Sequence, residues 1–155
     1  MSKREAVNDF LSQKSIAVVG VSRSGNKFSN SVFKELKQKG YRVIPVNPKA
    51  DSVEGERCYH RLTDIEAKPD AALIITPPGE TEGVVRDAAE AGIRRIWIQQ
   101  GAESNGALQL AQANGISAVS GDCILMFAEP AAFYHRLHRW VWKLLGRLPE
   151  ETKDE

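Results

Sequence analysis

The sequence predicts an α/β fold built on a parallel sheet of five strands with helices on both faces. Short β-branched and aliphatic runs alternate along the chain with segments whose apolar residues recur at helical spacing. Gly40, Gly92 and Gly115 follow the helical segments, at the place where a left-handed residue commonly ends a helix. Strands that are apolar on both sides and separated by helices are typical of a parallel sheet covered on both faces.

The first third of the chain contains a helix and then a strand–turn–helix–strand unit. Residues 3–13 have the apolar spacing of a short amphipathic helix. The run Ile16–Val19 predicts a strand, Phe28–Gly40 predicts a helix, and Tyr41–Val46 predicts a second strand. In such a crossover the amino terminus of the helix meets the end of the first strand, where free N–H groups favour an anion. We therefore expect the turn Gly20–Lys27 to hold phosphate.

Three further strands alternate with two helices in the rest of the chain. In the order strand, helix, strand, helix, strand, they are expected at residues 71–76, 80–91, 94–99, 105–114 and 116–120. The connection Ala50–Lys68 replaces a full crossover helix and contains one helical turn near Leu62–Ile65. With the first two strands, these segments predict a single Rossmann-like domain.

The composition excludes several classes of protein. A chain of 155 residues with a net charge of +1 has no global field that favours nucleic acid or an anionic membrane. No apolar run is long enough to cross a bilayer. The two cysteines lack C-x-x-C spacing and the histidines are not grouped, so no metal site is expected. We expect a cytoplasmic protein with one domain over residues 1–149 and a frayed acidic tail over residues 150–155.

The first turn departs from the NAD-binding pattern, which requires G-x-G-x-x-G and an acidic residue at the end of the second strand. Ser22 stands in place of the second glycine. The second strand runs into Asn47, Pro48 and Lys49, and Asp51 lies too far into the loop to replace the acid. Two interpretations of Lys49 stay open. It pairs with a phosphate on a ribose, as in NADP or the 3′-phosphorylated ADP of coenzyme A, or it is an ordinary solvated lysine.

Four motifs, in this order, resemble those of the stand-alone coenzyme A-binding domain family. They are VVGVSRSGNK, GYRVIPVNPK, DAALIITPP and IRRIWIQQGA, and the similarity runs from Ser15 to Cys123. The fold of this family is similar to the amino-terminal domain of the succinyl-CoA synthetase alpha subunit and of related ADP-forming acyl-CoA synthetases. The resemblance implies that coenzyme A or an acyl-CoA is bound where the loops after the strands converge.

The candidate binding residues implied by this resemblance follow the ends of strands. They are Gly20, Val21, Ser22, Arg23, Lys27, Asn47, Pro48, Lys49, Thr76, Pro77, Pro78, Gln100, Gly101, Ala102 and Cys123. In the family's arrangement the first turn would hold the diphosphate, with Ser22 donating and Arg23 or Lys27 neutralising charge. The second-strand loop would cover the adenosine, with Lys49 near its ribose phosphate.

Two of these assignments have structural alternatives. Thr76, Pro77 and Pro78 would pack against the adenine or the upper pantetheine arm, or the prolines merely end a strand before a helix. Cys123 would form a mixed disulfide with the thiol of coenzyme A under oxidation, or it is a partly buried structural thiol.

No catalytic constellation is found in the sequence. There is no G-x-S-x-G or H-E-x-x-H motif, and the related synthetases carry their phosphorylated histidine on a different domain. We therefore expect a coenzyme A-binding protein without chemistry of its own, acting as a regulator or carrier. One alternative is an NADP-binding reductase or sensor, in which Arg23, Lys27 and Lys49 hold the 2′-phosphate. Another is a partner subunit that completes an acyl-CoA synthetase in trans.

Residues 131–145 predict an amphipathic helix after Pro130. Trp140 and Trp142 lie two positions apart, so a helix turns them about 200° from each other and one face cannot bury both. The helix packs against the domain's own sheet, or its surplus aromatic area forms an interface. The sequence thus predicts a homodimer, or a complex with a protein partner, through this segment.

Overall fold

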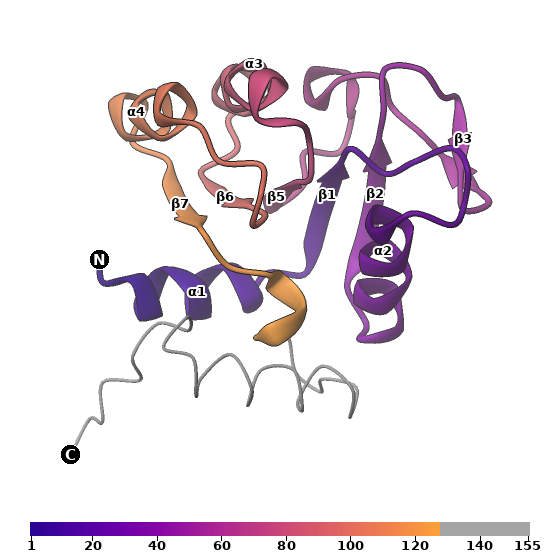
Figure 1. Ribbon diagram of the computed structural model, residues 1–155, viewed down its shortest axis with the longest axis horizontal. Helices are drawn as coiled ribbons and strands as arrows, with labels where there is room; N and C mark the ends of the chain where they lie inside the picture. Colours follow the sequence, from indigo (N-terminus) through magenta and orange to yellow (C-terminus); the bar gives the residue numbers. More distant parts are fainter. Residues whose placement is uncertain (128–155) are drawn as a thin grey trace.

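A five-stranded parallel sheet forms the centre of the protein (Figure 1). The structure, a computed structural model, describes residues 1–127. The strands are β1 (Ser15–Val19), β2 (Arg42–Val46), β5 (Ala71–Ile74), β6 (Arg95–Ile98) and β7 (Ser117–Ser120). They lie in the order β2-β1-β5-β6-β7, and every neighbouring pair is parallel. The expected fold class is confirmed. The helix expected at residues 131–145 and the tail at 150–155 lie outside the described residues.

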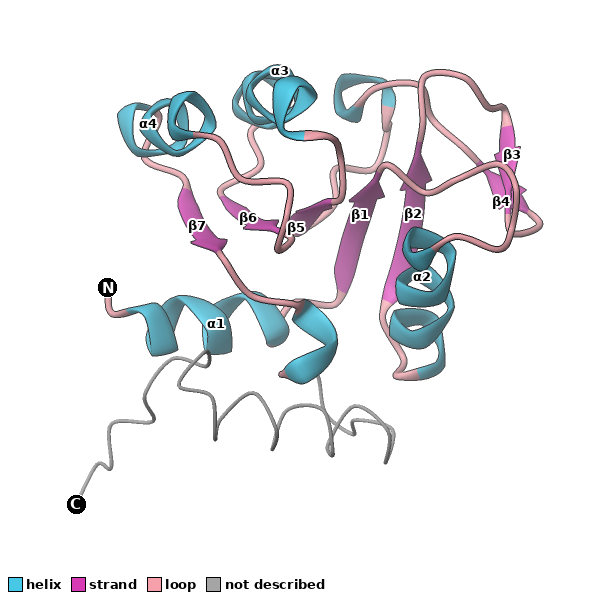
Figure 2. Cartoon of the chain, in the orientation of Figure 1, coloured by secondary structure: helices cyan, strands magenta, loops and turns pink. Residues whose placement is uncertain are grey.

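Two helices cover each face of the sheet (Figure 2). On one face lie α1 (Lys3–Leu11) and α2 (Phe28–Gln38), and on the other lie α3 (Pro78–Glu90) and α4 (Asn105–Ala113). A capping box starts α1, because Ser2 Oγ accepts from the amide of Glu5 while the Glu5 carboxylate accepts from the amide of Ser2. This helix ends at Leu11, earlier than the expected residue 13, and Ser12 caps it.

The strands divide the core into two apolar layers because successive side chains point to opposite faces. In β1, Ile16 and Val18 pack toward α1 and α2, whereas Ala17 and Val19 pack toward α3. Trp97 of β6 is fully buried in the layer that faces α1 and α2, and its indole Nε1 donates to the carbonyl of Asp122 at 3.0 Å. A buried indole N–H without a partner would oppose folding, so this bond permits the burial.

The connection between β2 and β5 contains a hairpin that the sequence analysis missed. Its strands are β3 (Ser52–Val53) and β4 (Glu56–Arg57), and the one-turn helix η1 (Leu62–Asp64) follows close to where a turn was expected. Glu54 and Gly55 both have positive φ, at 54° and 73°, as a tight hairpin turn requires. Strands of two residues are too short to produce a readable alternation. Because this connection supplies only one helical turn, the sheet next to α3 is incompletely covered.

Candidate functional site

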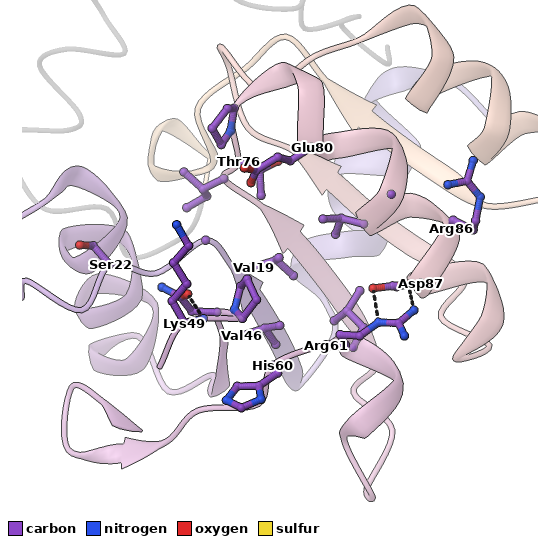
Figure 3. Close-up of a pocket in the computed structure, with 18 residues that line it drawn as sticks. Val19, Ser22, Val46, Lys49, His60, Arg61, Thr76, Glu80, Arg86 and Asp87 are labelled. Atoms are coloured by element: carbon purple, nitrogen blue, oxygen red, sulfur yellow. Dashed lines mark hydrogen bonds and ion pairs between the residues drawn. The ribbon is translucent and has the colours of Figure 1, made fainter. Parts of the chain in front are cut away.

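A cleft with a volume of about 660 Å³ lies at the carboxyl ends of β1, β2 and β5 (Figure 3). Its apolar lining comes from Val19, Val46, Leu62, Ile75 and Val84. One wall is the exposed side of α3, and the other is formed by the loops after β2 and β4. The crossovers that leave β1 and β2 lead to opposite sides of β1, which makes this edge the topological switch point, where open parallel sheets bind ligands.

Gly20 brings the first turn against the neighbouring loop. Its φ is +102°, and a Cβ atom at this position would lie 2.0 Å from the carbonyl oxygen of Ile75. The amide of Gly20 donates to Val46 at 2.9 Å, and the amide of Ile75 donates to Val19 at 2.8 Å. Only glycine fits both the backbone angle and the space. The turns after β1 and β5 therefore approach closely at the base of the cleft.

Asn30 holds the first turn in shape from beneath. This side chain is 1% exposed, and its Nδ2 donates to the carbonyl of Ser22 at 2.8 Å and to Glu54 Oε1 at 2.9 Å. Its Oδ1 accepts from the amide of Lys27 at 3.1 Å. The turn thus has its shape before any ligand arrives. Asn30 was not among the residues predicted from the sequence, although an amide side chain three residues after Lys27, in the first turn of a helix, is in a position to cap that helix.

Asn47 fixes the shape of the loop after β2 in a similar way. Its Nδ2 donates to the carbonyl of Val21 at 2.9 Å, and its Oδ1 accepts from the amide of Lys49 at 2.8 Å. Arg23 Nη1 donates to the carbonyl of Lys49 at 3.3 Å. These bonds join the first and second strand loops, so the side chains of Ser22 and Lys49 lie at the same end of the cleft (Figure 3).

Three exposed cations beside these loops have no carboxylate partner among residues 1–127: Arg23, Lys27 and Lys49. The lysines farther along α2 and at its carboxyl end are instead paired with glutamates, in Lys34–Glu54, Lys37–Glu56 and Lys39–Glu35. These charges lie in the loops next to the amino terminus of α2, where the amides of Phe28 and Ser29 have no hydrogen bond among the described residues. Charge and helix dipole both favour an anion at this place.

The opposite end of the cleft is closed by an ion pair that the sequence analysis missed. Arg61, before η1, binds Asp87 of α3 through Nε–Oδ2 at 3.2 Å and Nη2–Oδ1 at 2.6 Å. The hydrogen bonds that Arg61 donates to Asp87 raise the pKa of the Arg61 guanidinium above its ordinary value. His60 also lines the cleft, and its Nε2 is 2.8 Å from Asp51 Oδ1.

The cleft is also lined by residues of α3, which were not predicted because the candidate residues were taken from the loops after the strands. These residues of α3 are Glu80, Gly83, Val84, Arg86 and Asp87. Glu80, Gly83, Val84 and Asp87 recur at the spacing of one helix face. That spacing is a readable signal: a helix that follows a ligand-binding loop presents one such face to the same ligand.

The structure brings part of the predicted site together. The predicted residues that line the cleft are Gly20, Ser22, Asn47, Pro48, Lys49, Thr76 and Pro77. Arg23 and Lys27 are exposed beside it, whereas Val21 is buried in the core and Pro78 is the first residue of α3.

The loop after β6 does not line the cleft. The amides of Gln100 and Gly101 already donate to Asp122 O at 3.2 Å and to Glu103 Oε2 at 2.7 Å. Ala102 is buried and acts indirectly: its carbonyl accepts from Thr81 Oγ1 at 2.7 Å, and Thr81 Oγ1 lies 2.8 Å from Thr76 Oγ1. This chain of hydroxyls fixes the loop of Thr76.

Cys123 also lies away from the cleft. It belongs to the apolar layer under α1 and α2, is 6% exposed, and burial raises the pKa of its thiol. A raised pKa lowers the thiolate fraction that attacks disulfides. This environment favours the structural role over a mixed disulfide. Burial likewise raises the pKa of Cys58.

Neither a membrane-spanning helix nor a group of metal-binding side chains is found between residues 1 and 127. No helix there is long and apolar enough to cross a membrane. No three histidine, cysteine, aspartate or glutamate side chains in this range are grouped so that they could hold a metal ion.

Together, the glycine turn, the cationic helix terminus and the apolar cleft at the switch point define a Rossmann-like α/β domain of the kind that binds nucleotides. The chain belongs to the CoA binding domain family, which it matches over residues 14–129. The resemblance expected from the motifs is therefore confirmed.

The relatives include stand-alone proteins and longer ligases. The chain is 30% identical to YneT of Bacillus subtilis strain 168, described as uncharacterized, over 79% of its own length and 91% of that protein. It is 32% identical to the ADP-forming acetate–CoA ligase II of Archaeoglobus fulgidus, over 71% of this chain but only 18% of the ligase. A hypothetical protein from Pyrococcus horikoshii has a similar structure, with a TM-score of 0.74, 30% identity, and coverage of 80% and 87% of the two chains.

Proposed function

We propose that this protein binds coenzyme A or an acyl-CoA, with the nucleotide part of the ligand in the cleft between α3 and the loops after β1 and β2. The observation that carries the proposal is the cluster of Arg23, Lys27 and Lys49, which have no carboxylate partner within residues 1–127, around a turn whose shape is fixed by Asn30 and Asn47. A phosphorylated ligand would find both compensation for its charge and a pre-formed site there.

The cationic end and the apolar floor of the cleft suggest the orientation of the bound ligand. The diphosphate would meet Ser22 and the amino terminus of α2, and Lys49 would lie near the ribose phosphate. The adenine would cover the apolar floor of Val19 and Val46. A volume of about 660 Å³ is in the range of sites for drug-sized ligands, so the cleft has room for the nucleotide part of coenzyme A.

The function that fits this geometry is that of a cytoplasmic binding module, regulatory or carrying, without catalysis of its own. The match over 91% of YneT supports a protein that works as a single small unit. A second candidate is a subunit that completes an acyl-CoA synthetase in trans, which the similarity to one region of the acetate–CoA ligase favours. The expected homodimer or partner contact through residues 131–145 stays a prediction.

A thermal-shift panel of coenzyme A, acetyl-CoA, NADPH, NADH and ATP tests the proposal. Coenzyme A at a hundredfold excess over its dissociation constant should stabilise the fold by about 2.7 kcal/mol. For a protein of this size, that corresponds to a rise in melting temperature of roughly 5 to 11 °C. NADH should produce no comparable rise. An equal or larger rise with NADPH would instead support an NADP-binding protein.

A further inference from the structure

The cleft has three chemically distinct parts in one line (Figure 3). Ser22 and Lys49 lie at one end, and the aliphatic side chains of Val19 and Val46 lie in the middle. The Arg61–Asp87 pair closes the other end. A nucleotide with its phosphates at the cationic end and its base on the apolar floor therefore points the outer edge of the base at this ion pair.

The pair has a fixed bidentate geometry, although the Arg61 side chain is 57% exposed. Two parallel hydrogen bonds join the guanidinium to the carboxylate, which fixes both groups in one plane. The Asp87 side chain is 19% exposed, and it is anchored on α3, whereas Arg61 comes from the β2–β5 connection. The contact thus joins the two walls of the cleft beyond its apolar floor.

Its chemistry complements the outer edge of adenine. A guanidinium has five N–H donors, and a carboxylate has more acceptor positions than one arginine uses, so each partner keeps free capacity. Adenine presents an acceptor at N1 and a donor at its 6-amino group along one edge. A donor and an acceptor held side by side can bond both.

We propose that the Arg61–Asp87 pair is a specificity determinant that reads the outer edge of adenine and excludes bases enlarged at that edge. The inference rests on the proposed function, because it assumes a coenzyme A nucleotide in the cleft. Adenine modified at N1 and the 6-amino group loses the acceptor and the donor of this edge and gains bulk on the side that faces the ion pair.

The test compares coenzyme A with its 1,N6-etheno derivative, whose bridge covers both atoms, by calorimetric titration. The wild-type protein should bind the etheno compound at least about tenfold more weakly than coenzyme A. In Asp87→Ala and Arg61→Ala the two ligands should bind within about threefold of each other, since the end wall is open. Asp9→Ala is the matched control: it breaks another arginine–aspartate pair, between Asp9 of α1 and Arg95 of β6, neither of which lines the cleft, and the wild-type ratio should persist.

Each outcome separates the inference from the proposed function. If the wild-type protein binds no coenzyme A, the proposed function fails and this inference with it. If coenzyme A binds and the etheno compound binds equally well, only the inference is overturned. Discrimination that survives in both Asp87→Ala and Arg61→Ala, in proteins whose melting curves show a folded state, also overturns it.

Discussion

Gly20 is the residue on which the position of the first turn depends most directly. It combines a left-handed backbone with a contact that leaves no room for a side chain, because the Cβ of any other residue would overlap the carbonyl of Ile75. The obstacle is backbone, which cannot rotate away as a side chain could. The approach of the loops after β1 and β5 is thus fixed by the absence of one methyl group.

We predict that Gly20→Ala lowers the free energy of unfolding by about 3 kcal/mol or more, because it adds a backbone clash to an unfavourable φ. Urea denaturation measures the change. Gly40→Ala is the control, since Gly40 has a similar φ of +96° but no atom within 4 Å of the added Cβ. It should cost about 1 to 2 kcal/mol. Equal losses in the two variants would show that the contact with Ile75 has no energetic weight.

Lys49 is the cation best placed to distinguish coenzyme A from other adenine nucleotides. It lines the cleft and has no carboxylate partner among the described residues, so its ammonium group is available to a ligand. Lys49→Ala should weaken the binding of coenzyme A by about 1 to 3 kcal/mol and leave dephospho-coenzyme A unchanged, because a charge-assisted bond to the 3′-phosphate is lost.

Calorimetric titration of both ligands measures this difference. Lys34→Ala serves as the control, since Lys34 of α2 is already paired with Glu54 of the β3–β4 turn and lies outside the cleft. If Lys49→Ala lost the same affinity for both ligands, Lys49 would contribute only to the overall positive electrostatic potential and not to recognition of the 3′-phosphate.

At the scale of elements, the strands and helices were predictable because each has a clear period. The buried runs of β1, β5 and β6 consist of aliphatic residues and tryptophan, and the helices between them end at glycines with positive φ. The hairpin β3–β4 could not be predicted in this way, because its pairing depends on the Glu54–Gly55 turn and not on a hydrophobic pattern. The far end of the cleft was also missed: Arg61 and Asp87 are 26 positions apart and only the fold joins them.

The junction between β1 and β5 depends on a carboxylate at the start of β5. Asp70 Oδ2 accepts from the amides of Ser15 at 3.1 Å and Lys14 at 3.2 Å. These bonds, chiefly the one from Ser15, lower the pKa of Asp70 below its ordinary value of 3.8. The folded state therefore favours the ionised form. Its contribution to stability is present above pH 3.8 and is lost as the pH falls through the lower folded-state pKa.

We therefore predict that Asp70→Asn flattens the loss of stability on acidification. Urea midpoints measured from about pH 5 down to about pH 2.5 should fall less steeply in the variant than in the wild type. Glu66→Gln removes a carboxylate that is exposed and has no hydrogen bond among the described residues, so its profile should follow the wild type. Parallel profiles for Asp70→Asn and the wild type would contradict the assigned role.

At the scale of the whole molecule, the position of the cleft follows from the order of the strands. The order β2-β1-β5 places the loops of the first, second and fifth strands at one edge, and the short β2–β5 connection leaves space beside α3. The loop after β6 and Cys123 were expected in the same site, but they are tied into the core and the other apolar layer. Sequence position alone could not tell which strand-end loops face the open side.

Amide chemical shifts followed during a titration with coenzyme A test the central claim most directly, because they report binding and its location together. The largest shifts are predicted at Ser22, Lys49 and Thr76, which line the cleft. Val119, in the apolar layer on the opposite face, should remain unshifted. No shifts at saturating coenzyme A, or shifts centred on α4 and β7, would contradict the assignment of this cleft as a coenzyme A site.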